Sequence, residues 1–275
     1  MKRRKFLTSA IVASGMTFVS PFKANASIFD DNHIISTDPN EIKRGNLPNV
    51  HLQNGGTGEV ILPHSYSIIS DPTNRAPTRK VERFELRHRD YWENEGQADK
   101  HRIDVGPGLG SVQYGDEHLY EWNFFIEDDF LQGFDDTCHI FGNVHDFSDV
   151  HRYQTNHMLT LHGYRRNVFR LSTTIFNGRR REIHTLAPYA ELVGRWVNFK
   201  WHVKWSEEGF HRYWIDDSFR YEYKGFTLSS RTPTDTARIN YGLYRNRVLE
   251  WEQLNGKPEQ TKRMLVSDYK RRNVS

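Results

Sequence analysis

The segment Trp196–Trp205, WVNFKWHVKW, decides the fold because apolar and polar side chains alternate along its whole length. This period of two predicts a β-strand with one face in a core and the other in solvent. The predicted core face holds Val197, Phe199, Trp201, Val203 and Trp205, and the predicted solvent face holds Asn198, Lys200, His202 and Lys204. We therefore expect a sheet with a polar, basic outer face.

Further strands surround this segment at short intervals. Two turn sequences divide residues 206–223, which predicts a β-meander. Upstream, Asn177-Gly178 joins the predicted strands 168–176 and 181–185, because this dipeptide favours the type I′ turn of a hairpin. Aromatic residues form 13% of the chain and no convincing amphipathic helix is present. Together these patterns predict an all-β sandwich or jelly roll.

Residues 1–26 have the pattern of a signal peptide, with a basic start, an apolar run from Phe6 to about Val19 and the small-residue sequence Ala24-Asn25-Ala26. Arg3-Arg4 resembles the start of a twin-arginine signal, and an ordinary secretory signal is the alternative. The apolar run is shorter than the ~20 residues that a spanning helix needs. We expect a secreted or periplasmic protein that has no membrane contact after cleavage.

Removal of residues 1–26 changes the formal net charge from +3 to −2, because they include five basic residues and no acidic one. Nucleic acid is therefore not an expected partner, since binding it requires many basic contacts to phosphates. Cys138 is the only cysteine, which excludes an internal disulfide. We expect an irregular lead-in at 27–75, with one strand near Gly58–Leu62, and a single β-domain at 76–275 that is a monomer.

The segment CHIFGNVHD, residues 138–146, is the first candidate for chemistry. Regular alternation places Phe141, Asn143 and His145 on one face of a predicted strand. An amide beside an imidazole can hold a carboxylate and move a proton, because Asn donates hydrogen bonds and His titrates near neutrality. A histidine that only decorates the strand is the alternative.

The segment ARINYGLYRN, residues 237–246, is the second candidate. Asn240, Gly242, Tyr244 and Asn246 alternate onto one predicted face. A glycine inside a strand commonly marks close approach by another backbone or by a ligand. Tyr244 is therefore a candidate for contact with a ligand, and a tyrosine at the rim of the sheet is the alternative.

Arginine beside an acid recurs on two further predicted strands. In ERFELRHRD, residues 82–90, Arg83 and Arg87 flank a glutamate, and in HRIDV, residues 101–105, Arg102 precedes an aspartate by two residues. A carboxylate can hold a guanidinium so that its fork meets a substrate carboxylate. Surface ion pairing is the alternative for each arginine.

Together these segments resemble the jelly-roll polysaccharide lyases, which have a concanavalin A-like sandwich and include alginate lyases, glucuronan lyases and the heparin lyase I type. Segments that resemble their motifs R-T/S-E-L-R, Q-x-H and a terminal G-x-Y strand follow one another here in the same order. Asn143-Val144-His145 resembles Q-x-H with Asn for Gln, and Gly242-Leu243-Tyr244 resembles G-x-Y. Arg83–Arg87 fits the arginine motif by its letters, whereas Arg102 fits by its distance ahead of the Q-x-H-like strand and is favoured. The resemblance covers about residues 81–246.

The resemblance implies a lyase that cleaves a uronate-containing acidic polysaccharide by β-elimination. It implies that Asn143 and Arg102 hold the substrate carboxylate while His145 and Tyr244 share the base and acid roles. The expected substrate-binding residues are Arg83, Arg87, Lys200, His202, Lys204, Asn240 and Asn246. This chemistry requires no metal or cofactor, and Asp135-Asp136 leaves a structural calcium ion open. The polymer itself, whether glucuronan, alginate or a glycosaminoglycan, is not specified.

Two other classes of function stay open on the residues alone. A glycoside hydrolase on the same sandwich would need two carboxylates across the scissile bond, and no E-x-D-x-E strand occurs in the chain. A non-catalytic carbohydrate-binding module could use the same fold without acid–base groups. The motifs around His145 and Tyr244 favour the lyase over both.

Overall fold

The computed structural model divides into two compact units, Met1–Asp30 and Asp31–Ser275. All the residues that the structure describes belong to the second unit. They are 34–36, 50–53, 64–88, 90, 100–105, 111–130, 138–146, 157–162, 170–177, 180–231 and 237–275. The predicted signal peptide, the predicted strand at Gly58–Leu62 and Asp135-Asp136 lie outside the described residues.

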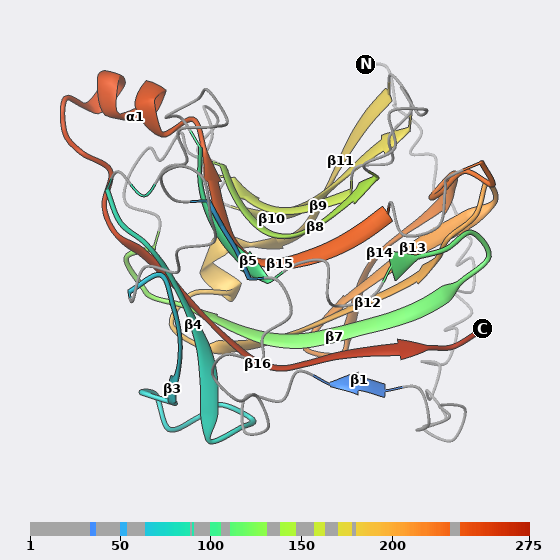
Figure 1. Cartoon of the computed structure of the whole chain (residues 1–275), viewed down its shortest axis with the longest axis horizontal. Coiled ribbons are helices and arrows are strands. Elements are labelled where there is room, and N and C mark those ends of the chain that lie inside the picture. Colours follow the sequence, from blue (N-terminus) through green and yellow to red (C-terminus); the bar gives the residue numbers. More distant parts are fainter. Residues whose placement is uncertain are drawn as a thin grey trace, which may run out of the picture. The chain divides into compact units, whose positions relative to one another are not determined.

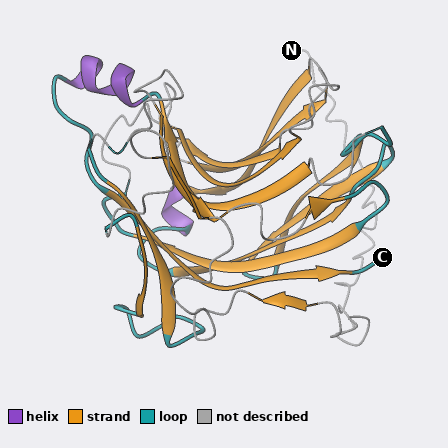
Figure 2. Cartoon of the chain, viewed as in Figure 1, coloured by secondary structure: helices purple, strands orange, loops and turns teal. Residues whose placement is uncertain are grey.

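The described part of the second unit forms two antiparallel sheets, each of eight strands. Sheet A has the order β14-β13-β12-β7-β16-β4-β3, with β1 paired to β16, and sheet B has the order β11-β10-β9-β8-β15-β5-β2, with β6 paired to β15. Figures 1 and 2 show these sheets as two layers of strands, and β8, β9, β10 and β11 bend away from sheet A. The all-β, jelly-roll prediction is confirmed.

The strands of sheet A are β1 (Ile34–Ser36), β3 (Tyr66–Ser70), β4 (Lys80–Leu86), β7 (Glu117–Ile126), β12 (Trp196–Lys204), β13 (Gly209–Ile215), β14 (Ser218–Gly225) and β16 (Lys262–Asn273). The strands of sheet B are β2 (Val50–Gln53), β5 (Lys100–Val105), β6 (Ser111–Val112), β8 (Cys138–Asp146), β9 (His157–His162), β10 (Arg170–Asn177), β11 (Arg180–Pro188) and β15 (Ala237–Asn246).

Strand β12 follows the predicted alternation, and its inward residues are at most 3% exposed. It continues through β13 and β14 as the predicted meander, in which Asp216 and Asp217 both have positive φ, as a tight hairpin turn requires. Strands β10 and β11 form the predicted hairpin, paired as far as Asn177 and Arg180. Local sequence patterns therefore account for these hairpins.

Aromatic side chains fill the space between the sheets. Trp201 stacks on Tyr120 with ring centroids 5.0 Å apart, and Phe124 of sheet A contacts Phe141 of sheet B at 5.6 Å. Rings of this size bury large apolar areas and make up much of a core's stabilisation. Since the core occupies the inner faces, a binding site must use an outer face or an end of the sandwich.

Two elements differ from the sequence expectations. The lead-in at 27–75 contributes three strands, because β1 pairs with β16, β2 with β5 and β3 with β4. A short helix, α1 (Val248–Asn255), follows β15 and buries Val248 and Trp251. Its end is marked by Gly256 in the left-handed conformation, the usual helix-terminating residue. Long-range pairing and burial, rather than periodicity, hold these short elements in place.

Candidate active site

Strands β5, β15 and β8 are neighbours in sheet B and carry the residues predicted to be catalytic. Arg102 of β5 lies directly opposite Tyr244 of β15. Directly opposite residues in an antiparallel pair have Cα atoms about 4.5–5.5 Å apart. The fold thus brings together two positions that are distant in the sequence.

Asn143 and His145 lie farther along β8. Asn143 pairs with Asn240, and His145 pairs with Arg238. Because a strand rises about 3.3 Å per residue, Asn143 is roughly 10–13 Å from Tyr244 along the sheet and His145 roughly 17–20 Å. The register does not place His145 next to Tyr244, and the sharing of the proton transfers between them stays a prediction. The sequence motifs by themselves do not give the distance between a residue of β8 and a residue of β15.

A β-bulge in β8 breaks the predicted alternation. Phe141 and Val144 are both buried in the core, although alternation places them on opposite faces and puts Phe141 beside Asn143. The pairing with β9 shifts register between Ile140 and Gly142. One extra residue in a strand changes which face the following residues occupy. The predicted face of Phe141 was therefore wrong.

Gly242 of β15 marks close approach by a neighbouring backbone. Its φ is +146°, and a Cβ there would lie 2.6 Å from both the Cα of Asp104 and the carbonyl oxygen of Ile103. Only glycine fits such a contact without displacing β5. Of the two explanations for this glycine, the structure shows the backbone contact, which holds β15 against β5 beside Tyr244.

The residues around this contact are polar and mostly covered. Tyr244 is half-buried, while Asp104 and Asn240 are each 4% exposed. The Oδ1 atom of Asn240 has no hydrogen-bond partner among the residues that the structure describes. Asn246 lies at the end of β15, paired with Lys100 of β5 and Cys138 of β8. This face of sheet B therefore offers hydroxyl, amide and guanidinium positions in neighbouring rows.

Sequence reasoning missed strand β2, whose residues complete two of these rows. Gln53 lies opposite Arg102, and His51 lies opposite Asp104. The alternation His51-Leu52-Gln53 was the available signal, but it spans too few residues to stand out from a lead-in rich in Asn and Gly. Pairing with β5 identifies it as part of the sheet.

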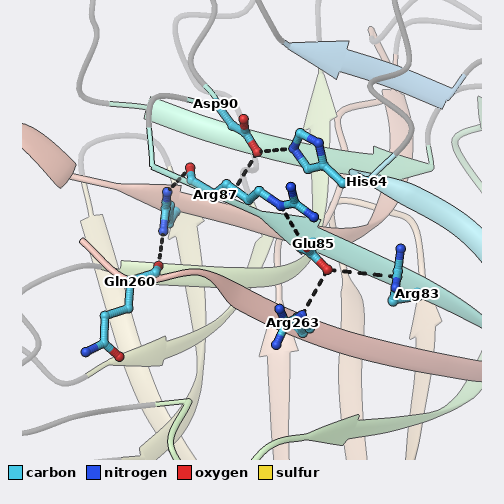
Figure 3. A network of polar contacts seen from close by, with 8 residues as sticks. His64, Arg83, Glu85, Arg87, Asp90, Gln260 and Arg263 are labelled. Atoms are coloured by element: carbon cyan, nitrogen blue, oxygen red, sulfur yellow. Dashed lines mark hydrogen bonds and ion pairs between the residues drawn. The ribbon is translucent and has the colours of Figure 1, made fainter. Parts of the chain in front are cut away.

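Arg83 and Arg87 lie elsewhere, on β4 of sheet A or just beyond its end. They form a cluster around Glu85, whose carboxylate contacts Nε of Arg87 at 2.6 Å, Nε of Arg263 at 2.9 Å and Nε of Arg83 at 4.0 Å (Figure 3). Burial would raise the pKa of Glu85, but the hydrogen bonds from Arg263 and Arg87 outweigh it and lower the pKa. Surface ion pairing, the alternative that the sequence left open, describes these two arginines, and they do not join Tyr244.

The basic row on β12 also belongs to sheet A. Lys200 contacts Asp217 at 2.5 Å and Glu121 at 3.7 Å, and His202 contacts Glu117 at 2.7 Å. Desolvation by burial lowers the pKa of His202 despite its contact with that carboxylate. Lys200, His202 and Lys204 therefore lie on a different sheet from Arg102 and Tyr244, so they do not line the same site.

The buried carboxyl group of Glu82 connects the two sheets through hydrogen bonds from a tyrosine of each sheet. Glu82 of β4 is fully buried and accepts hydrogen bonds from the hydroxyls of Tyr66 at 2.7 Å and Tyr241 at 2.8 Å. Desolvation raises its pKa to about 7 against the effect of the two hydrogen bonds. Among the described residues, no group of three or more His, Cys, Asp or Glu side chains is placed to hold a metal ion.

Comparison with known proteins identifies the class. The family model described as polysaccharide lyase matches residues 43–268, and the chain therefore belongs to the polysaccharide lyase family. The protein is an enzyme that acts on a polysaccharide. No curated protein sequence matches the chain at a significant level.

Solved structures share the fold. The endo-β-1,4-glucuronan lyase of the fungus Trichoderma reesei matches with a TM-score of 0.58 at 13% identity, over 83% of this chain and 91% of that one. A GH131 β-glucanase catalytic domain from Podospora anserina matches with a TM-score of 0.50 at 14% identity, over 89% and 94% of the two chains. The identities are low, so these matches show the sandwich architecture and not the substrate.

Proposed function

We propose that this polysaccharide lyase cleaves a uronate-containing polymer by β-elimination on the outer face of sheet B. The observation that carries the proposal is the register of β5 and β15, which sets Arg102 opposite Tyr244. The two residues supply two of the three functions that this reaction needs, namely a cation for the carboxylate and a proton donor for the leaving oxygen. The third function is a base that accepts the C5 proton.

The chemistry assigns a role to each of them. Removal of the C5 proton of a uronate places a second negative charge on the carboxylate, and a guanidinium can neutralise it through two parallel hydrogen bonds. The C4–O bond then breaks, a C4=C5 double bond forms, and the phenol of Tyr244 protonates the departing oxygen. Such a general acid contributes on the order of 10²–10⁴-fold in rate. Arg102 provides the positive charge, so the proposed mechanism uses no metal ion or other cofactor.

The remaining residues of the face suit neighbouring sugars of the polymer. The Asn143–Asn240 and His145–Arg238 pairs follow one another along β8 and β15, and Asn246 lies at the opposite end. Their spacing from Tyr244 exceeds the length of one sugar. Amide and basic groups in successive rows can bind hydroxyls and carboxylates of an extended acidic chain.

The carboxylate positions of β5, β8 and β15 do not suit a glycoside hydrolase. Strands β5, β8 and β15 contain Asp104 and Asp146, which pair with Gly242 and Ala237 of β15. Five residues of strand separate these positions, or roughly 17 Å along the sheet. Catalytic carboxyl pairs of glycosidases are about 5–9.5 Å apart. The geometry therefore favours elimination over hydrolysis.

We also propose that the enzyme is exported, on the pattern of residues 1–26. The described residues contain no helix with the length and apolar character needed to cross a membrane. N-terminal sequencing of the mature protein is expected to find a start near Ser27 outside the cytoplasm. An active enzyme that retains Met1 in the cytoplasm would contradict export.

Absorbance of the conjugated double bond tests the activity. The purified enzyme is incubated with glucuronan, alginate and a glycosaminoglycan, with a neutral β-glucan as the control. We expect absorbance and new reducing ends to rise together with at least one uronan. New reducing ends without absorbance would indicate a hydrolase, and binding without either signal would indicate a carbohydrate-binding module.

A further inference from the structure

Strand β2 adds an amide and an imidazole position beside the Arg102–Tyr244 pair. It pairs with β5 on the side opposite to β15. Gln53 lies opposite Arg102, and His51 lies opposite Asp104. Gln53, Arg102 and Tyr244 therefore form one row across three strands, and His51 belongs to the next row.

The register separates two histidines that could act as the base. The Cα atom of His51 is two strands and two residues from that of Tyr244, or about 12 Å, and about 8 Å from that of Arg102. His145 is roughly 17–20 Å from Tyr244 by the same measure. A uronate bound at Arg102 would have the strand of His51 on one side and the strand of Tyr244 on the other, and His145 would be farther along the sheet.

Asp104 of β5 lies between His51 of β2 and Gly242 in the irregular part of β15. It lies opposite His51 on one side and opposite Gly242 on the other, and it is 4% exposed. A buried carboxylate next to an imidazole can fix its tautomer and favour its protonated form.

We propose that His51 is the base that removes the C5 proton, that Gln53 binds the uronate carboxylate together with Arg102, and that Asp104 is a positioning residue for His51. This assignment rests on the proposed β-elimination. The proton moves from C5 to the imidazole, the electron pair forms C4=C5, and the C4–O pair leaves with a proton from Tyr244. Solvent then restores both groups, so no further reactant is needed.

Matched histidine variants test the base. His51→Gln is expected to lower kcat by about 10²-fold or more on a uronan that the wild type cleaves, and His145→Gln is expected to raise KM with a much smaller change in kcat. His88→Gln is the control, because His88 contacts Glu252 beyond the end of β4, and it should stay within about threefold. His51→Ala should regain activity in added imidazole, which a merely structural histidine would not show. A large loss in His145→Gln with little loss in His51→Gln would overturn the assignment.

Further variants test the neighbours of His51. Gln53→Ala should lower kcat/KM by about tenfold or more, and Asn143→Ala should have the smaller effect. Asp104→Asn should lower the apparent pKa of the acidic limb of the pH–rate profile, because the imidazole loses its anionic neighbour. An unmoved limb in a folded Asp104→Asn enzyme would remove Asp104 from the site.

The outcomes separate this assignment from the activity itself. If the wild type forms no unsaturated product from any uronan, the proposed function fails and the assignment fails with it. If the wild type forms that product and His51→Gln keeps its kcat, the lyase stands and the assignment alone is wrong. Thermal denaturation of each variant identifies losses caused by misfolding, and imidazole rescue of His51→Ala remains informative in a partly destabilised variant.

Discussion

Strands β4 and β5 both carry arginine near an acidic residue, and they lie in different sheets. At the end of β4, the half-exposed side chain of Arg87 shares the carboxylate of Glu85 with Arg263. On β5, Arg102 lies between Gln53 and Tyr244, one row from Asp104. The first arrangement is an ion-paired surface cluster, and the second is a row of different chemical groups.

This difference shows that the residues on neighbouring strands, and not the sequence of the arginine's own strand, decide which groups an arginine can act with. The guanidiniums around Glu85 already have a carboxylate, and a second anion would have to compete with it. Arg102 has a phenol position on one side and an amide position on the other. In the proposed site, a carboxylate bound at Arg102 would therefore have a proton donor in the next strand. The following changes test that contrast.

Arg102→Ala is expected to have the largest effect. Loss of the positive charge that neutralises the carboxylate should lower kcat/KM by roughly 10²–10³-fold, as measured on the uronan that is cleaved best. Arg83→Ala is the control on β4 and should stay within about threefold. A larger loss in Arg83→Ala would reverse the roles of the two strands.

Tyr244→Phe should lower kcat by about 10²-fold with little change in KM, because the ring remains and only the proton donor disappears. Tyr221→Phe provides the comparison on sheet A, since Tyr221 is also half-buried and its hydroxyl bonds His184 at 2.9 Å. Steady-state rates of both variants give the answer. Equal losses would mean that Tyr244 is not the acid.

Glu85→Gln should affect stability and leave the rate within about twofold. The change leaves Arg83, Arg87 and Arg263 without their shared carboxylate and should lower the free energy of unfolding by about 1–3 kcal/mol in denaturant titrations. If kcat fell by more than the loss of folded protein explains, the cluster around Glu85 would take part in the reaction. The contrast between β4 and β5 would then not hold.

Glu82 on β4 should make stability fall as pH rises. Its pKa is about 7 in the fold, above the usual glutamate value of 4.5, so the folded state keeps a proton that the unfolded state loses. This contribution is fully present below pH 4.5 and is lost as pH rises to about 7. The melting temperature of the wild type relative to Glu82→Gln should decline over that range. A flat difference would show that Glu82 titrates normally.

Several parts of the fold could be predicted because they depend on neighbouring residues only. The alternation in β12 and the turns of the β12–β14 meander are local, and each matches the structure. The bulge at Phe141 could not be predicted, because it depends on how β8 pairs with β9 and β15. Strand β2 was missed for the same reason, since four residues become a strand only through β5.

The candidate site divides in the same way. The sequence alone predicted an all-β protein, because strand alternation is a pattern of consecutive residues. Its resemblance to the jelly-roll lyases indicated the class of enzyme and proposed Arg102 and Tyr244 as catalytic residues. Only the tertiary structure decided that Arg83 and Arg87 belong to another sheet, that His145 is distant from Tyr244, and that β2 lies beside Arg102. Register is set by hydrogen bonds between segments far apart in the chain, and a one-residue bulge changes it without leaving a clear mark in the local pattern.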